Sequence, residues 1–177
     1  MVKNTKMLLA EIKSEGKRPN KILLIDILPT SGPRWHQKVL EHLDNALIEA
    51  LEHQREQKYG LSYFKRLLLA GASPNARDGI NQTALHHSVE ARNSGICALL
   101  LENGAKPNAK DNVGLTPLHN AVYHDKTKIC KLLVENGADV DAKDNNGETP
   151  LEMAKRHKRT EILKVLRAAR AKKAGST

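Results

Sequence analysis

The stretch DNVGLTPLHNAVYHDKTKICKLLVENGADVDA, residues 111–142, decides the fold, because nearly the same sequence precedes it and begins again after it. The related stretches start at Asp78 and Asp144, so three aspartates follow one another at a step of 33 residues. Such a fixed period is typical of repeat proteins, whose units bury a continuous core by stacking on their neighbours. The same step relates three further sets of residues: Thr83, Thr116 and Thr149; Leu85, Leu118 and Leu151; and Gly71, Gly104 and Gly137.

The composition favours a core of closely packed thin helices. Apolar residues make up 40% of the chain, but aromatic residues only 3%, so leucine and alanine must fill the interior. Cys97 and Cys130 occupy the same place in successive units. Neighbouring helices pack about 8–10 Å apart, beyond the Cα separation of about 7 Å that a disulfide tolerates. We therefore predict two buried, reduced thiols, which fits an intracellular compartment.

Each unit is predicted to open with a turn, followed by a short helix and a longer one. The repeated threonine suits the N-cap of the short helix, where its hydroxyl accepts a backbone hydrogen bond. In the last unit, Thr149 and Glu152 complete a capping box. Gly114 and Gly147 lie in the preceding turn, and Asn81 takes their place in the first regular unit. Asparagine tolerates the left-handed backbone that this turn requires.

The two ends of the chain depart from the period. Residues 1–33 contain two short apolar segments and a Pro/Gly break, which predicts a degenerate helical cap; a flexible leader is the alternative. Residues 34–77 are predicted to form an atypical first repeat, with helices over 35–57 and 61–69 and an enlarged connection. Residues 78–110 and 111–143 are regular repeats. Residues 144–173 form a basic closing repeat, with its second helix over 160–172, and residues 174–177 a disordered tail.

Nothing in the sequence predicts secretion or membrane insertion. The N-terminal stretch is broken by charges and lacks the continuous apolar region of a signal peptide. The longest apolar run, from Ile22 to Leu28, is interrupted by Asp26 and is far shorter than the roughly 20 residues that a spanning helix needs. We expect a soluble protein.

The net charge of +9 is concentrated at the C-terminal end. Nine lysines and arginines against one glutamate, between Lys155 and Lys173, contribute +8 of this charge. A basic helix can attract nucleic acid, an acidic protein or an anionic membrane, and the run KRHKR resembles a nuclear-localisation signal. The alternative is a solubilising cap, because terminal repeats present a polar outer face to water. The basic patch comprises Lys155, Arg156, Lys158 and Arg159.

The repeated stretch of sequence resembles the ankyrin repeat. The TPLH-type helix starts, the Gly-Ala after the second helix and the aspartate of the next turn recur in phase from Asp78 to about Ala169, and the tail of the preceding unit matches from Leu61. The family often has glycine between the two helices of a unit. This chain has Arg92, Asp125 and Lys158 there, which leaves the geometry of those turns open.

The resemblance implies an all-α solenoid, an L-shaped stack of helix pairs with projecting β-hairpin fingers. It also implies protein binding on the concave face that the fingers and first helices form. Val113, Leu115 and Tyr123 stand out there, because apolar residues at solvent-facing positions tend to mark binding sites; packing against the next finger is the alternative. The full set of candidates is Ile80, Gln82, Glu90, Asn112, Val113, Leu115, Tyr123, His124, Asn146, Glu148, Arg156 and His157.

The sequence predicts no enzyme, metal or cofactor site. His86 and His119 are explained by the repeat motif, in which the histidine hydrogen-bonds at the helix start, and the adjacent His86 and His87 point to different faces. No CxxC, HExxH or glycine-rich phosphate loop occurs. Cys97 would lie inside the helix stack, out of reach of a base, and Ser88 lies in no nucleophile motif.

We therefore predict a non-enzymatic, monomeric scaffold or adaptor that binds a partner protein in the cytoplasm, with a nuclear location as an alternative. A charge-driven binder that uses the basic helix is the second hypothesis. A third is the targeting part of a secreted bacterial effector, which would act in the host-cell cytosol.

Overall fold

The computed structural model describes residues 33–53 and 59–174, and it confirms the all-α repeat fold. No strand forms within these residues, and an isolated antiparallel bridge joins Arg77 to Thr83 at the base of one finger. The fingers are therefore mostly turns rather than paired strands. The helices are α3 (Pro33–Glu52), α4 (Leu61–Leu69), α5 (Ala84–Glu90), α6 (Ser94–Glu102), α7 (Pro117–Tyr123), α8 (Thr127–Glu135), α9 (Pro150–Arg156) and α10 (Thr160–Ala174).

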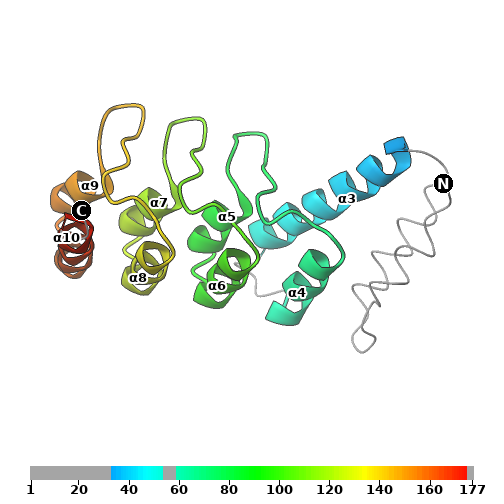
Figure 1. The fold of residues 1–177 in the computed structure, drawn as a ribbon, viewed down its shortest axis with the longest axis horizontal. Coiled ribbons are helices and arrows are strands. Elements are labelled where there is room, and N and C mark those ends of the chain that lie inside the picture. Colours follow the sequence, from blue (N-terminus) through cyan, green and yellow to red (C-terminus); the bar gives the residue numbers. More distant parts are fainter. Residues whose placement is uncertain (1–32, 54–58, 175–177) are drawn as a thin grey trace.

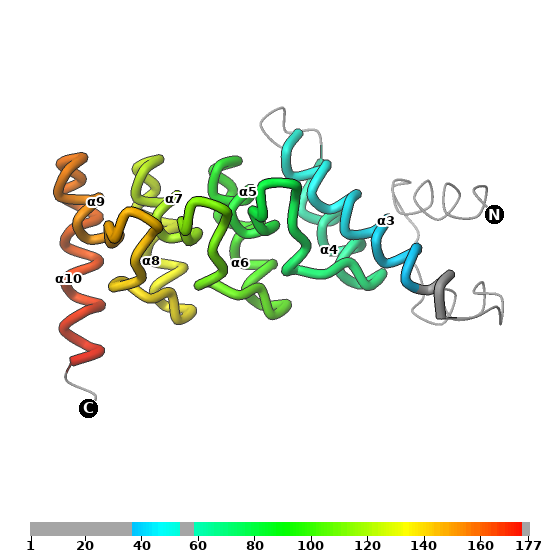
Figure 2. Tube along the Cα trace, turned by 90° about the horizontal axis from the view of Figure 1, so that it is seen from above, coloured from blue at the N-terminus to red at the C-terminus, as the bar shows by residue number. Residues whose placement is uncertain are grey.

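The helices stack as antiparallel pairs in two layers. The first helices, α3, α5, α7 and α9, follow one another in one layer, and α4, α6, α8 and α10 form the second (Figure 1). Three finger loops project from the side of the first helices, one before each of α5, α7 and α9. Seen from above, the pairs repeat along one line, with α10 extending beyond the length of α8 (Figure 2).

Each short helix begins with a capping box that uses the repeated threonine. In the last unit Thr149 Oγ1 accepts from the Glu152 amide at 3.3 Å, and Glu152 Oε2 accepts from the Thr149 amide at 2.9 Å. In the other two units histidine replaces the glutamate: His86 Nδ1 accepts from the Thr83 amide at 3.1 Å. The predicted histidine bond at the helix start is thereby confirmed.

Residues with a left-handed backbone conformation follow the second helices and lie in the finger turns. Gly71, Gly104 and Gly137 follow the second helices with φ of 109°, 87° and 84°, as predicted. In the finger turns, Asn81 adopts a φ of 67°, like the glycines of the next two fingers. The positive φ of this asparagine confirms the predicted turn.

The turns between the two helices of a unit are left-handed even without glycine. Arg92, Asp125 and Lys158 have φ of 59°, 56° and 55°. The Arg92 amide donates to Val89 O at 3.0 Å, and the following amide donates to Ser88 O at 3.2 Å. These are the two hydrogen bonds of a Schellman motif, so the turn keeps its shape at the expense of backbone strain.

The core runs through all the described units as one cluster of leucine, isoleucine, valine and alanine. The site of Cys97 and Cys130 is taken by Phe64 in the first unit, and all three side chains are fully buried. Both cysteines are free thiols, as predicted. Burial raises the pKa of Cys97 to about 11 and that of Cys130 to about 12.

The first unit replaces its short helix by α3, which spans Pro33–Glu52 and is followed by His53 in a 3₁₀ turn. Its apolar face packs on α4 and α5. Asp44 Oδ1 accepts from the Ser73 amide at 2.6 Å. In the next units Asn75 and Asn108 accept in the same way from the amides of Lys106 and Asp139. A side chain of α3 thus takes the place of a loop asparagine from a preceding repeat.

The closing helix α10 continues six residues beyond the point at which its counterparts end, and two ion pairs hold the extension. Arg170 Nε lies 3.1 Å from Asp141, and Lys173 Nζ lies 2.9 Å from Asp139. On its inner face Ile162 is fully buried. Two cations of the predicted basic closing repeat are therefore paired with carboxylates of the preceding unit.

Three predictions concern residues outside the described part: the cap or leader over residues 1–33, of which only Pro33 is described, the end of the first helix at residue 57, and the tail after Ala174. Ala174 itself is the last residue of α10. Among the described residues no helix is both long and apolar enough to cross a membrane.

Candidate protein-binding surface

The three fingers are held in one shape by their first aspartate. Asp111 Oδ1 accepts from the Val113 amide at 3.0 Å and from the Leu115 amide at 2.8 Å. Asp78 and Asp144 make the same pair of bonds in the other two fingers. These carboxylates point into their own turns, so the side chains at the tips are presented on a fixed backbone.

The tips of neighbouring fingers are joined to each other. The Asn112 amide donates to Ile80 O at 3.2 Å, and the Asn145 amide donates to Val113 O at 3.1 Å. Asn145 Nδ2 also donates to Asn112 O at 3.1 Å. The three fingers therefore form one continuous row rather than three independent loops.

Apolar side chains project from this row and from the helix beside it. Ile80 and Val113 are 57% and 56% exposed, and Tyr123, at the end of α7, is 57% exposed. Asn112 and Asn146 are also exposed at the tips. Val113 and Tyr123 thus face solvent, as predicted, and do not pack beneath the next finger.

The structure corrects the prediction for Leu115. This side chain is half-buried and packs against the core, because the chain turns back towards the helix layer immediately before Thr116. Its carbonyl oxygen accepts a hydrogen bond from His86 Nε2 at 3.1 Å. Gln82 and Glu90 are likewise half-buried.

The exposed ring of Tyr123 belongs to an aromatic cluster at the ends of α7 and α9. It makes edge-to-face contacts with His124 and His157, at centroid distances of 5.2 and 5.6 Å. Beside them Arg156 binds Glu148 through two bonds of 2.8 Å each. The fork lowers the pKa of the glutamate and fixes the last finger to α9.

Two buried histidines, at the starts of α5 and α7, each bind the finger of the next unit. His86 donates through Nε2 to Leu115 O, and His119 lies 3.2 Å from Glu148 O in the same arrangement. Both rings are completely buried. Burial lowers their pKa below the ordinary value of 6.5, so both are neutral at pH 7 and serve as structural links.

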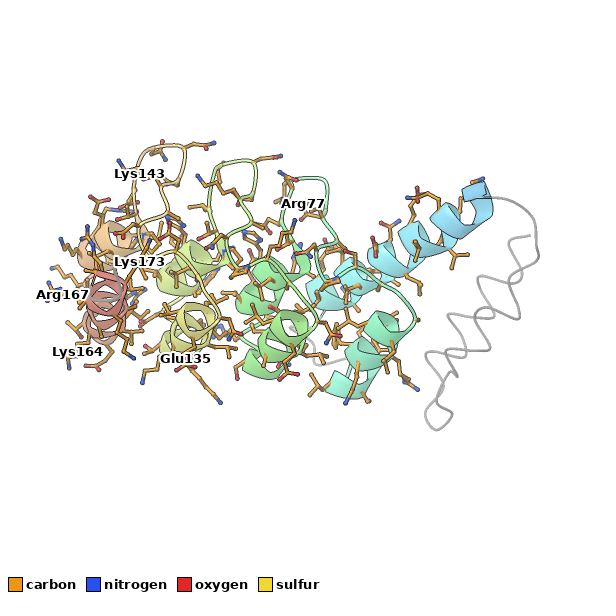
Figure 3. All side chains as sticks on the ribbon, in the orientation of Figure 1. Arg77, Glu135, Lys143, Lys164, Arg167 and Lys173 are labelled. Atoms are coloured by element: carbon orange, nitrogen blue, oxygen red, sulfur yellow. The ribbon has the colours of Figure 1, made fainter. Side chains whose placement is uncertain are left out.

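The finger row also carries three cations that were not predicted from the sequence, at Arg77, Lys110 and Lys143. Figure 3 labels the first and the last of them. Arg77 Nη1 donates to Lys110 O at 3.0 Å, and Lys110 Nζ donates to Lys143 O at 2.7 Å. All three side chains are exposed. The 33-residue step that relates them is visible in the sequence and would have identified them.

The predicted basic patch divides into paired and unpaired charges. Arg156 is bound to Glu148, and Arg159 Nη1 lies 3.1 Å from Asp125. Lys155 and Lys158 are exposed and form no ion pair with the described residues. The four residues therefore do not act as one uniformly free cationic surface.

One group of side chains has the composition of a metal site. Ligand atoms of Glu52, Asp78 and His87 lie within 4.8 Å of one another, and His87 Nε2 is 2.9 Å from Asp78 Oδ2. Sequence spacing did not reveal this group, because its members come from α3, a finger and α5. The direct contact with Asp78 already occupies Nε2 of His87 and ties the finger to α5.

A reactive thiol is not present in the described part. Cys97 Sγ lies 3.0 Å from Ser88 Oγ, and its raised pKa keeps it protonated at neutral pH. Thiols attack as thiolates, so neither cysteine is suited to nucleophilic catalysis.

Stacked helix pairs with fingers joined in a row define a repeat solenoid. The chain matches the sequence profile of a family described as ankyrin repeats (3 copies), over residues 53–144 and 94–175. It belongs to the ankyrin repeat family. A comparison with curated proteins gave no match. Ankyrin repeats are generally protein–protein interaction modules, and the family is typically non-enzymatic.

Proposed function

We propose that the protein is a non-enzymatic adaptor that binds a partner protein on the surface formed by the finger tips and the ends of the first helices. The observation that carries this proposal is the exposure of Val113 and Tyr123 on the central repeat, next to the exposed Ile80. In the regular repeats, these are the exposed large hydrophobic residues. Burial of one such side chain in an interface is worth about 1.5–3 kcal/mol.

The rigidity of the surface supports the same function. Fingers whose tips hydrogen-bond to one another, and which buried histidines tie to the short helix of the preceding unit, lose little conformational freedom when a partner binds. Preorganised surfaces bind more tightly because less entropy is lost on association. Tyrosine and arginine are also the residue types enriched among binding hot spots, and Tyr123 lies beside Arg156 here.

The test is capture of binding proteins from cell lysate with immobilised protein. We expect Val113→Arg/Tyr123→Ala to lose the specific partner, because one change places a charge in the interface and the other removes an aromatic anchor. The matched control is Leu61→Arg/Leu69→Ala on α4, where two leucines are 49% and 60% exposed outside the proposed surface. Both proteins must keep the wild-type circular dichroism spectrum.

Retention of every captured protein by Val113→Arg/Tyr123→Ala would contradict the proposed function. Equal loss in the α4 control would place the binding surface elsewhere.

A further inference from the structure

The finger row combines a stripe of cations with exposed apolar tips. Arg77, Lys110 and Lys143 stand at the same position in three consecutive fingers, each three residues before a tip residue: Ile80, Val113 and Asn146. Because the Arg77 guanidinium and the Lys110 ammonium group each donate to a carbonyl oxygen of the next finger, these two side chains are aligned along the row.

These three cations differ from four cations of the last repeat in their contacts with carboxylates. Arg156, Arg159, Arg170 and Lys173 all form ion pairs. Within residues 33–53 and 59–174, the three finger cations form none. The neighbouring finger aspartates are turned inward, where each Oδ1 accepts two amides of its own turn.

The spacing of the cations selects the conformation of a ligand. Neighbouring helix pairs, and so equivalent residues of neighbouring fingers, are about 8–10 Å apart. A polyproline II segment has three residues per turn and rises about 3.1 Å per residue, so every third side chain returns to one face after about 9 Å. A β-strand turns its residues i and i+3 to opposite faces. An α-helix has 3.6 residues per turn, so residues at every third position drift away from one face.

We propose that the finger row binds an extended, acidic segment of a partner protein in the polyproline II conformation, with a glutamate or aspartate at every third residue. The three carboxylates meet Arg77, Lys110 and Lys143, and apolar side chains between them contact Ile80 and Val113. This inference rests on the proposed function, since it names the chemistry of the partner at the same surface. Fingers joined tip to tip keep the cations in register for a ligand of this kind.

The direct test uses two fluorescein-labelled, proline-rich peptides of identical composition, with three glutamates at every third or at every second position. Fluorescence anisotropy at low ionic strength measures their dissociation constants. We expect the three-residue spacing to bind about tenfold more tightly, since each correctly placed exposed ion pair contributes a fraction of a kcal/mol. The affinity should fall as salt screens the charges.

Two triple variants with the same change in charge identify the surface. Arg77→Gln/Lys110→Gln/Lys143→Gln should abolish the preference for three-residue spacing, while glutamine keeps a donor for the finger carbonyls. Arg167→Gln/Lys128→Gln/Lys131→Gln, which removes three exposed cations from α8 and α10, should leave the preference intact. Melting temperatures of both variants show that the fold is retained.

Three results would overturn the inference: equal affinity for the two spacings, equal loss in both variants, or tighter binding of a single-stranded oligonucleotide of the same charge that is lost in the same finger variant. If the peptides fail but Val113→Arg/Tyr123→Ala still loses its partner, only the chemistry assigned to the partner is wrong. If that variant retains its partner, the proposed function itself fails.

Discussion

At the scale of single residues, the chain holds non-glycine residues in left-handed turns. Arg92, Asp125 and Lys158 have φ between 55° and 59°, a conformation that costs a non-glycine residue about 1–2 kcal/mol. Each residue sits where a Schellman motif requires this backbone. The turns thus store strain that glycine would relieve.

We predict that Lys158→Gly stabilises the protein by about 0.5–1 kcal/mol, because relief of the strain exceeds the entropy that glycine loses on folding. Arg92→Gly should behave in the same way. Asp125→Gly should gain less, because aspartate tolerates the left-handed region better and Asp125 also pairs with Arg159. Urea denaturation measures the change.

The matched control for this series is Lys155→Gly, an exposed lysine in the last turn of α9, which should lower the free energy of unfolding by up to about 1 kcal/mol. Destabilisation by Lys158→Gly of the same size as that by Lys155→Gly would show that the turn is not strained.

Residue patterns predicted most of the local structure but not the surroundings of single side chains. The left-handed conformation of Asn81 follows from its place in the period. The half-burial of Leu115 does not, because a finger position predicts exposure only if the path of the returning chain is known. The role of Asp44 was also invisible, since the first unit has lost the motif and only its packing shows what replaces a loop asparagine.

At the scale of elements, neighbouring units are joined by specific links between fingers and helices. His86 and His119 each bridge from the start of a short helix to the carbonyl of the next finger. In the last unit Glu152 takes the position of these histidines in the capping box. The two bridges make the joints between the last three units depend on neutral imidazole.

We predict that unfolding free energy falls as the pH is lowered from 7.5 to 5.5. Burial lowers the pKa of both histidines in the folded protein below 6.5, so the unfolded chain takes up protons first. The contribution of the two neutral histidines to the free energy of unfolding is complete above pH 6.5. It is lost progressively below that pH, by at most about 1.4 kcal/mol per pH unit for each ring.

His86→Gln/His119→Gln should flatten this dependence, whereas the exposed His53→Gln should not. The glutamates whose pKa is lowered lose their contribution only below their ordinary value of 4.5, outside the measured range. An unchanged slope in the double histidine variant would contradict the assignment.

The close contact between fingers gives a second prediction for an element. A methyl group added at Gly114 would meet the backbone nitrogen of Asn145 at 2.6 Å, as well as its side chain, whereas one added at Gly147 meets nothing within 4 Å. Their φ values, 80° and 81°, are nearly equal. Gly114→Ala should therefore cost at least about 1 kcal/mol more than Gly147→Ala.

Thermal unfolding of the two alanine variants measures the difference, and the strain of the left-handed backbone cancels between them. Equal losses would mean that the fingers are not joined as a row.

At the scale of the whole molecule, stability depends on contacts between neighbours along the stack. Each first helix contacts the first helices before and after it, and the second helices behave in the same way. Arrays of this kind behave as quasi-one-dimensional systems, in which loss of a central unit disconnects those on either side. The ion pairs of α10 also join neighbours, since Arg170 and Lys173 bind carboxylates of the repeat before it.

We predict that Leu118→Ala and Leu166→Ala, both of which truncate fully buried leucines, differ in the extent of their effect. Each cavity costs about 2–5 kcal/mol. Leu118→Ala, in α7, should raise the rate of hydrogen exchange in α5, α6, α9 and α10 as well as in its own repeat. With Leu166→Ala, in α10, the faster exchange should be confined to the last repeat. Exchange profiles that are identical in the two variants would contradict nearest-neighbour coupling.

Much of the fold at this scale followed from the period of 33 residues. The distribution of charge could not be predicted in this way. The cations of α10 can be counted in the sequence, but only the structure shows that Asp139 and Asp141 neutralise two of them. The finger cations were missed for the opposite reason, since each is only one residue in a repeat of nearly balanced charge. Three-dimensional packing was needed to separate paired from unpaired cations.

The central claim is that the finger tips and first-helix ends bind a partner protein, and site-specific photocrosslinking tests it most directly. A benzoylphenylalanine in place of Val113 or Tyr123 should give one covalent adduct of the same partner after irradiation in cell lysate, and the same probe in place of Lys131 or Lys164, on α8 and α10, should give none. Adducts from the α8 and α10 positions alone, with none from 113 and 123, would contradict the account.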